Sequence, residues 1–255
     1  MVKLKYRLSG CLLHALRKLR FRKTYVSAVI LAAGNGSRMN SDVTKQWLNL
    51  DGKPVFVHSL LAFQNCRRIN EIILCVKRDE LPLYDDISVR YGISKLKAVI
   101  AGGETRSDSA LRGFKKISDK TTHVAIHDAA RCLVTPEMIT SVLRQAVACG
   151  AAIAGCKSSD TVKICSADGY ITSTPERKSV FLAQTPQIFE TEIYRASVYT
   201  ALKDSIVVTD DSGMAEHAGF TVKTVDCGKE NLKITEPVDI CIAEAILNSR
   251  KVNAE

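Results

Sequence analysis

The sequence predicts an α/β protein with a Rossmann-like, mostly parallel sheet that is flanked by helices. Strand-like and helix-like segments alternate along the chain from Val26 onward, which is typical of repeated strand–helix–strand units. The strand-like segments are continuous apolar runs, as expected for strands that are covered on both faces. At 255 residues the chain is long enough to bury one complete core.

The individual elements follow from periodicity and from the residues that start and stop each segment. Strands are expected at residues 26–31, 69–76, 96–101, 123–127 and 221–226. Helices are expected at residues 54–66, 79–91, 106–117, 136–149, 191–202 and 237–247, with a short helix after Thr209-Asp210-Asp211. Ligands of such sheets bind beyond the carboxyl ends of the strands, so the loops after the strands at 26–31, 96–101 and 123–127 should converge on one rim.

Residues 152–183 interrupt this alternation. Two extended runs, residues 153–165 and 170–174, flank Ala167-Asp168-Gly169, which is a hairpin signal. We interpret the segment from about 155 to 180 as a β-arm that protrudes from the sheet. A two-stranded hairpin is only marginally stable in water, so the arm is expected to pack on a second copy of the chain in a homodimer.

The formal net charge of +9 is concentrated in the first 24 residues, which carry eight basic residues and no acidic one. The remainder is nearly neutral, which gives no support to a nucleic-acid-binding function. Residues 1–24 place leucines at helical spacing, and three interpretations stay open: a solvated helix or tail, a helix on a membrane surface or a partner, and an organelle transit peptide. No apolar run is long enough to cross a membrane.

Nine cysteines are scattered along the chain without any Cys-x-x-Cys pair. This spacing fits neither a zinc site nor a disulfide framework. Several of them, such as Cys75 and Cys241, lie in apolar runs, where a free cysteine behaves as a small hydrophobic residue. We therefore expect a reducing compartment.

A glycine loop follows the first predicted strand. It reads Ala32-Ala33-Gly34-Asn35-Gly36-Ser37-Arg38-Met39, and Lys45 follows shortly after. Glycines let the backbone approach a ligand closely, and loop amides can point at phosphate oxygens. The dinucleotide fingerprint requires a third glycine where Met39 stands, and the Gly-Lys-Ser/Thr of a P-loop is absent. With the positive charges of Arg38 and Lys45, the loop predicts a polyphosphate site of another kind.

Further motifs lie at the other predicted loops. These are Gly102-Gly103-Glu104-Thr105-Arg106-Ser107-Asp108-Ser109, His127-Asp128-Ala129-Ala130-Arg131, Asp160-Thr161-Val162-Lys163, Ala183-Gln184-Thr185-Pro186-Gln187 and Thr209-Asp210. In this order and spacing, together with the glycine loop, the set resembles the 2-C-methyl-D-erythritol 4-phosphate cytidylyltransferase family over residues 26–250. The resemblance implies cytidylyl transfer from CTP to 2-C-methyl-D-erythritol 4-phosphate, with release of pyrophosphate, in the non-mevalonate pathway of isoprenoid precursors.

The resemblance also implies a role for each matching residue. Nucleotide binding would fall to Ala32, Ala33, Gly34, Gly36, Gly102, Gly103, Glu104, Ser109 and Ala129. Catalysis would fall to Arg38, Lys45 and Lys233, and acceptor binding to Asp128, Arg131, Thr161, Arg177 and Thr185, with the arm residues Thr161 and Arg177 acting across the dimer. Asp128 would also hold Mg²⁺, which favours oxygen ligands and bridges phosphates. Residues 1–24 would then be a basic extension, 25–250 a single nucleotidyltransferase domain and 251–255 a tail.

Alternatives remain at the level of both function and single residues. A ribitol 5-phosphate cytidylyltransferase would share the same loops, and a non-catalytic regulator would bind CTP without turnover. Ser109 could bond to the local backbone, and Arg106 could be a surface charge. His127 should point to the opposite side of its strand from Asp128, so we expect it to be structural. Cys132 stands where family members usually carry proline, which bears on the rigidity of that loop.

Overall fold

A seven-stranded sheet forms the centre of the computed structural model, which describes residues 21, 23–34 and 44–252. Its strands, in the order β11-β7-β10-β6-β1-β4-β5, are β1 (Val26–Leu31), β4 (Glu71–Val76), β5 (Leu96–Ala101), β6 (His123–Asp128), β7 (Ala151–Lys157), β10 (Phe181–Glu190) and β11 (Lys223–Asp226). Strand β10 runs antiparallel to β6 and β7, and the other neighbours pair in parallel. The mostly parallel sheet predicted from the sequence is confirmed.

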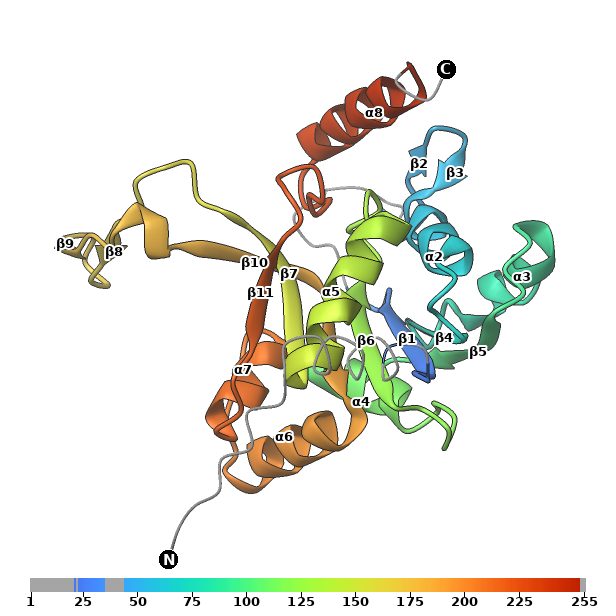
Figure 1. Ribbon diagram of the computed structural model, residues 1–255. Helices are drawn as coiled ribbons and strands as arrows, with labels where there is room; N and C mark the ends of the chain where they lie inside the picture. Colours follow the sequence, from blue (N-terminus) through green and yellow to red (C-terminus); the bar gives the residue numbers. More distant parts are fainter. Residues whose placement is uncertain (1–20, 22, 35–43, 253–255) are drawn as a thin grey trace, which may run out of the picture.

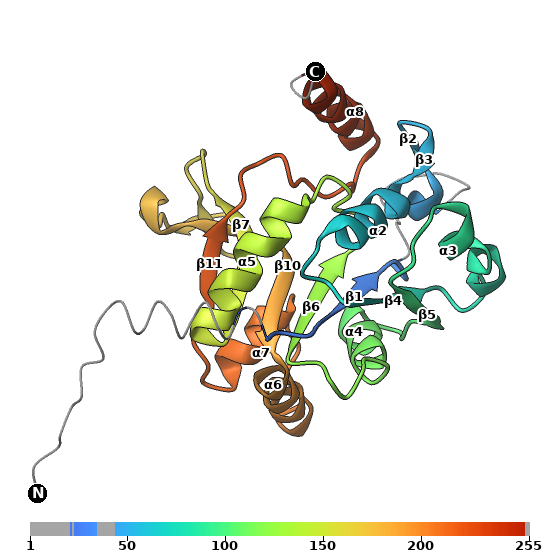
Figure 2. The same ribbon diagram turned by 45° about the vertical axis from the view of Figure 1, so that its right-hand side comes forward.

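Helices cover both faces of this sheet, as Figure 2 shows. The helices α2 (Val55–Asn65) and α5 (Pro136–Cys149) pack on one face, and α4 (Arg106–Phe114), α6 (Thr191–Lys203) and α7 (Asp211–His217) on the other. Successive side chains of β1 point to opposite faces of the sheet. Ala28 and Ile30 therefore belong to the hydrophobic cluster on one face, and Val29 and Leu31 belong to the cluster on the other. Burial on both faces is the physical reason for the continuous apolar runs of the sequence.

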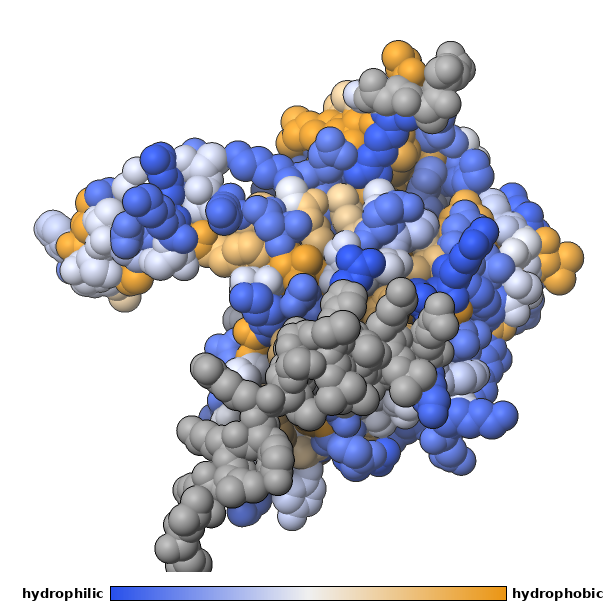
Figure 3. Space-filling view, viewed as in Figure 1, coloured by the Kyte–Doolittle hydropathy of each residue, from blue (hydrophilic) through white to orange (hydrophobic). Residues whose placement is uncertain are grey.

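The closing helix α8 (Pro237–Val252) lies apart from these layers (Figure 1). Its inner side contributes to a third, smaller cluster, and the Lys251 ammonium lies 2.6 Å from the Asp51 carboxylate beside the short strands β2 (Asn49–Leu50) and β3 (Lys53–Pro54). Hydrophobic side chains gather over α8 in Figure 3, in line with the exposure of Val238 and Ile242. Within the described residues, no helix combines the length and the apolar character that crossing a membrane requires.

The predicted arm is present but shorter than expected. Strands β8 (Ile164–Cys165) and β9 (Ile171–Ser173) pair in an antiparallel hairpin that projects from the body of the molecule (Figure 1). The 3₁₀ helix η4 (Arg177–Ser179) leads back to the sheet. The prediction was wrong for residues 155–157, which belong to β7 of the central sheet, where they pair with residues 181–183 of β10.

Three other differences have local causes. Strand β10 was not predicted, because Pro186 breaks the strand signal; the pairing register shifts between Ala183 and Gln187, which is where a strand tolerates proline. The segment 79–91 forms two short pieces, η3 (Leu81–Tyr84) and α3 (Ile87–Arg90), instead of one helix. The helix expected at 106–117 ends at Phe114, and the closing helix extends beyond 247 to Val252.

Candidate active site

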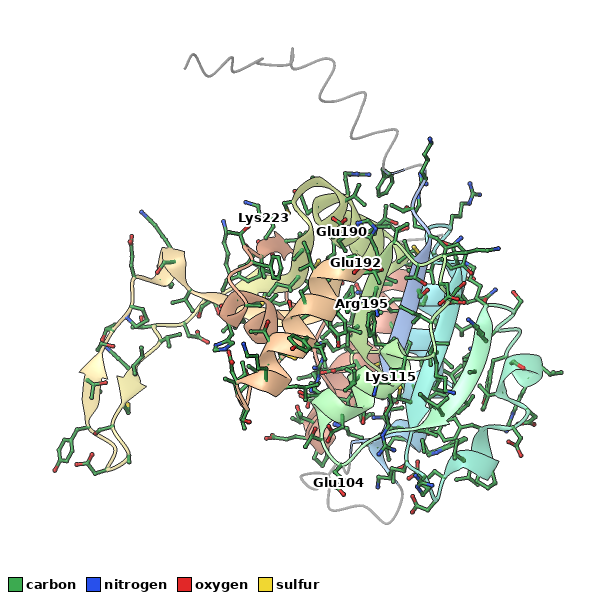
Figure 4. The ribbon with its side chains drawn as sticks, turned by 90° about the horizontal axis from the view of Figure 1, so that it is seen from below. Glu104, Lys115, Glu190, Glu192, Arg195 and Lys223 are labelled. Atoms are coloured by element: carbon green, nitrogen blue, oxygen red, sulfur yellow. The ribbon has the colours of Figure 1, made fainter. Side chains whose placement is uncertain are left out.

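A pocket of about 650 Å³ opens at the carboxyl ends of β1, β4, β5 and β6. Nine of the residues that sequence analysis assigned to the site line it: Ala33, Gly34, Lys45, Gly102, Gly103, Glu104, Ser109, Asp128 and Lys233. Lys45 opens the 3₁₀ helix η2 (Lys45–Trp47), and Glu104 lies exposed at the edge of the molecule (Figure 4). Parallel strands bring their loops together at this rim, so residues distant in sequence meet in one cavity.

Close packing explains the two glycines on the β5 side of this pocket. A Cβ on Gly102 would lie 2.6 Å from Cβ of Ala33 and 2.8 Å from Oγ of Ser109, and a Cβ on Gly103 would overlap Asp108. The Ser109 hydroxyl accepts a hydrogen bond from the backbone N–H of Gly103 at 3.0 Å and donates one to the carbonyl of Thr105 at 3.0 Å. The Ser109 hydroxyl therefore fixes the backbone of this loop, in agreement with the alternative that Ser109 bonds to the local backbone.

Asp128 ends β6 and forms the floor of the pocket between two cations. Its Oδ1 accepts a hydrogen bond from Nε of Arg106 at 3.0 Å, and its Oδ2 accepts one from Nζ of Lys233 at 2.7 Å. Burial raises the pKa of the Asp128 carboxyl, but Arg106 and Lys233 outweigh burial and hold that pKa well below its ordinary value. The carboxylate is therefore ionised throughout the physiological range.

Arg106 is held in turn by a second carboxylate. Its Nη1 donates to Oδ2 of Asp211 at 2.6 Å, and Oδ1 of Asp211 accepts a hydrogen bond from the Tyr194 hydroxyl at 2.9 Å. Arg106 is thus no surface charge, and the two carboxylates raise its pKa further although burial opposes this. Sequence analysis left the role of Arg106 undecided and assigned no role to Asp211 or Tyr194. Nothing in the spacing of these residues along the chain indicates that they contact one another.

The segment that carries Lys233 has no regular secondary structure and depends on a buried amide. Nδ2 of Asn231 donates to Oε1 of Gln184 and to the carbonyl of Thr185, both at 2.9 Å. The carbonyl of Asn231 accepts a hydrogen bond from Nη1 of Arg131 at 2.9 Å. These bonds tie the segment to β10 and to the loop after β6. Asn231 is a further residue that sequence analysis missed.

A smaller pocket of about 220 Å³ lies next to the first and shares Arg106, Asp128 and Lys233 with it. Its remaining walls come from Arg131, Ala183, Gln184, Thr185, Gln187, Thr209 and Asp210. The Thr185 hydroxyl accepts a hydrogen bond from the backbone N–H of Asp128 and lies 3.0 Å from Nδ1 of His127. The two pockets thus meet at the Asp128 carboxylate.

His127 has the structural position expected from its place on the strand. Its ring is fully buried and packs against Phe63 with ring centroids 5.0 Å apart. Burial lowers the pKa of His127 to about 3, so the imidazole is neutral at physiological pH.

Four further assigned residues line neither pocket. Ala32 and Ala129 are buried in the core, where their backbone N–H groups bond to the carbonyls of Cys75 and Leu31. Thr161 and Arg177 are exposed on the arm. Gly36 and Arg38 lie outside the described residues.

Asp128 could hold a divalent cation together with a bound triphosphate. The described residues contain no group of three or more histidine, cysteine or acidic side chains that could hold a metal ion by themselves. A carboxylate offers about four acceptor positions, of which Arg106 and Lys233 occupy two. One protein carboxylate plus phosphate oxygens is a usual environment of Mg²⁺, so the residues present fit that ion.

Comparisons with known proteins agree with the geometry. The family model described as "IspD: 2-C-methyl-D-erythritol 4-phosphate cytidylyltransferase" matches residues 26–249. The chain is 38% identical over 230 residues to the enzyme of that name from Syntrophus aciditrophicus, covering 90% of this chain and 98% of that protein. It is 37% identical over 227 residues to the one from Alkaliphilus metalliredigens, covering 89% and 94%.

Solved structures show the same likeness. The crystal structure of 4-diphosphocytidyl-2C-methyl-D-erythritol synthase from Anaerococcus prevotii superposes with a TM-score of 0.80 at 31% identity, covering 90% of this chain and 99% of that one. The cytidylyltransferase from Thermus thermophilus gives a TM-score of 0.71 at 28% identity, covering 88% and 98%. The likeness therefore extends over most of the chain.

Proposed function

The chain belongs to the 2-C-methyl-D-erythritol 4-phosphate cytidylyltransferase family, and on that premise we propose how its two pockets share the reaction. The activity is cytidylyl transfer from CTP to 2-C-methyl-D-erythritol 4-phosphate, which gives 4-diphosphocytidyl-2-C-methyl-D-erythritol and pyrophosphate. We assign roles to the residues of the site because the two pockets meet at Asp128 and Lys233.

CTP would occupy the larger pocket. The backbone at Gly102 and Gly103, held by Ser109, suits the hydrogen-bonding edge of a pyrimidine, because it presents backbone groups without side chains in the way. Lys45 lines the same cavity near Gly34 and is suited to the triphosphate. Gly36 and Arg38 follow Gly34 closely in the sequence, and Arg38 would complete the proposed set of cations.

The acceptor would occupy the smaller pocket. Arg106, Arg131 and Lys233 give this pocket a cationic wall that suits a phosphate monoester, and Thr185, Gln187 and Asp210 offer polar groups for the polyol hydroxyls. The guanidinium of Arg131 bonds to the carbonyls of Asn231 and Ala183, which hold it at this wall of the pocket.

The reaction would then be an in-line displacement at the junction of the pockets. An oxygen of the acceptor phosphate forms a bond to the α-phosphorus of CTP, and the bond from that phosphorus to the bridging oxygen of the β-phosphate breaks. The electron pair leaves with pyrophosphate. Lys45 and Lys233 stabilise the charge that develops on the α-phosphoryl oxygens. Asp128 would hold Mg²⁺ together with the triphosphate, and the bound ion would supply positive charge that offsets the charge of the phosphates.

The arm would complete the acceptor site of a second subunit. Thr161 and Arg177 are exposed on it and line neither pocket of their own chain. Ile164, Tyr170 and Ile171 are 51%, 74% and 61% exposed. Apolar side chains this exposed on a small hairpin favour a homodimer in which the arm is covered. Arg177 would then reach the acceptor phosphate of the partner subunit.

Residues 25–250 would form one catalytic domain, with 1–24 as an extension that is not part of the site and 251–255 as a tail. The eight cysteines of the described chain are all free, which favours a cytoplasmic enzyme. Whether activity survives removal of residues 1–24 tests this division of the chain.

The acceptor is tested by measuring pyrophosphate release from CTP with 2-C-methyl-D-erythritol 4-phosphate and, separately, with ribitol 5-phosphate. We expect rapid release with the first and little with the second. A preference for ribitol 5-phosphate would refute the assigned acceptor. CTP binding without turnover on either compound would favour a non-catalytic regulator instead.

A further inference from the structure

A chain of four alternating charges crosses the floor of the active site. It starts at Asp211 on α7, continues through Arg106 on α4 and Asp128 at the end of β6, and ends at Lys233. Each link is one hydrogen bond, of 2.6, 3.0 and 2.7 Å respectively. Tyr194 on α6 adds a neutral donor to the Asp211 end at 2.9 Å.

The Asp211 end of this chain touches neither pocket. The Asp211 side chain is fully buried and so is Tyr194, and neither residue lines either of the two described pockets. A buried carboxylate is costly unless it is paired and hydrogen-bonded, and here Arg106 and Tyr194 supply both partners. Asp211 can therefore influence a substrate only through Arg106.

The position of Asp211 is itself fixed. The Asp210 side chain caps α7 by accepting from the backbone N–H of Gly213 at 3.0 Å. Gln187 on β10 donates to Asp210 at 2.7 Å and accepts from the backbone N–H of Ser212 at 2.9 Å. Helix α7 is thus anchored to the sheet on both sides of Asp211.

Arg106 uses two of its three guanidinium nitrogens, one for each carboxylate, and its Nη2 is buried without a hydrogen-bond partner in the described part of the chain. It gives Nε to Asp128 and Nη1 to Asp211, so Asp128 receives only one of its hydrogen bonds. A guanidinium without a second partner prefers the two-pronged contact with a single carboxylate. Arg106 would then compete for Oδ2 of Asp128, which now accepts from Lys233.

We propose that Asp211 and Tyr194 are positioning residues that hold Arg106 to a single contact with Asp128 and so keep Lys233 in place where the two pockets meet. This rests on the proposed function, in which Lys233 stabilises the reacting phosphoryl group. Loss of the Asp211 charge would let Arg106 rotate onto Asp128 and would displace the Lys233 ammonium. The chemical step would suffer, while the nucleotide pocket around Gly102 and Gly103 would stay intact.

The test compares Asp211→Asn and Tyr194→Phe with the matched control Tyr199→Phe, whose ring is 70% exposed on the same helix. A shift of Lys233 by a fraction of an ångström should lower kcat about tenfold in Asp211→Asn and about threefold in Tyr194→Phe, with KM for CTP changed by less than about twofold. The control should keep kcat within about twofold of the unchanged enzyme. Melting temperatures of all three are measured alongside.

The variant Arg106→Lys tests whether Asp211 affects kcat through Arg106 or only stabilises the fold. A lysine cannot bridge two carboxylates in this geometry, so Arg106→Lys should lower kcat as Asp211→Asn does. In the double variant the two losses in kcat should not add, because both break the same chain. Independent, multiplying losses would overturn the proposal.

A second result would also overturn the proposal: a folded Asp211→Asn variant whose melting temperature is lowered but whose kcat stays within about twofold of that of the unchanged enzyme. If that variant does not fold, the kcat of Tyr194→Phe decides in the same way. Asp128→Asn and Lys233→Met separate this inference from the proposed function. If these two keep their kcat, the assigned site is wrong; if they lose it while Asp211→Asn and Tyr194→Phe do not, only the positioning role is wrong.

Discussion

The Lys233 ammonium lies 2.7 Å from Oδ2 of Asp128, although the two residues are 105 positions apart in the chain. Asp128 is fixed by the ladder of β6, whereas Lys233 lies in an extended segment without regular structure. The geometry of the pair therefore depends on what anchors that segment. The buried side chain of Asn231, two residues before Lys233, is one anchor, and the backbone N–H of Ile234, which donates to the carbonyl of Ala130 at 2.8 Å, is another.

Replacement of Asn231 should accordingly affect the chemical step. Asn231→Ala removes both hydrogen bonds to β10, so Lys233 loses its fixed position and kcat should fall about tenfold or more, with a smaller change in KM for CTP. Steady-state kinetics of pyrophosphate release measures this. The control Asn248→Ala lies at the exposed side of α8 and should behave as the unchanged enzyme. An Asn231→Ala enzyme with normal kcat would mean that Lys233 needs no such anchor.

Lys45→Ala tests the proposed contact with the triphosphate. Removing a cation that stabilises developing charge commonly costs on the order of 10²–10³ in rate, so turnover should fall about a hundredfold or more while the fold stays intact. Circular dichroism and pyrophosphate release are measured on the same preparation. Lys115→Ala, an exposed residue outside the pocket (Figure 4), serves as the matched control. Near-normal turnover of Lys45→Ala would refute the assigned role.

Arg177→Ala tests the contribution of the arm. If the exposed guanidinium binds the acceptor phosphate of a partner subunit, the KM for 2-C-methyl-D-erythritol 4-phosphate should rise about tenfold or more, and the KM for CTP should change little. The neighbouring Lys178→Ala, which is equally exposed, controls for general loss of charge. Equal effects on both substrates would argue against the role of the arm. Sedimentation of the unchanged enzyme shows independently whether the chain is a dimer.

The sequence predicted the parts of this site that depend on local patterns. The apolar runs located β1, β5 and β6, and because parallel strands present their carboxyl ends at one edge, the loops with Gly34, Gly102 and Asp128 could be placed together. The same reasoning placed His127 on the far side of its strand, where it is buried.

Local sequence patterns could not predict which distant residues contact one another. Arg106 and Asp211 are 105 positions apart, and no spacing rule links a helix start to a later helix start. Tyr194 and Asn231 are ordinary polar residues in sequence, and only their burial reveals their partners. Strand β10 was missed for a different reason, since Pro186 contradicts the strand pattern unless the pairing shifts beside it.

The partly buried His58 predicts a pH dependence of stability that does not involve the active site. Burial lowers the pKa of His58 below its ordinary 6.5, and the bond from Nε2 to the carbonyl of Leu50, 2.7 Å long, opposes this without cancelling it. Well above pH 6.5 the histidine is neutral in the folded and the unfolded chain alike. As the pH falls below that value, the unfolded chain binds the proton first, so the free energy of unfolding should decrease.

His58→Gln lacks this proton uptake, so its free energy of unfolding should fall less steeply than that of the unchanged protein between about pH 7 and pH 5. Urea unfolding at a series of pH values measures both slopes, and comparing slopes removes any constant loss of stability caused by the substitution itself. The unchanged protein should have the steeper slope, because a base whose pKa is lowered in the folded state always favours unfolding on acidification. Parallel curves would show that His58 titrates alike in both states, and a steeper fall in the variant would mean that the folded state favours the imidazolium.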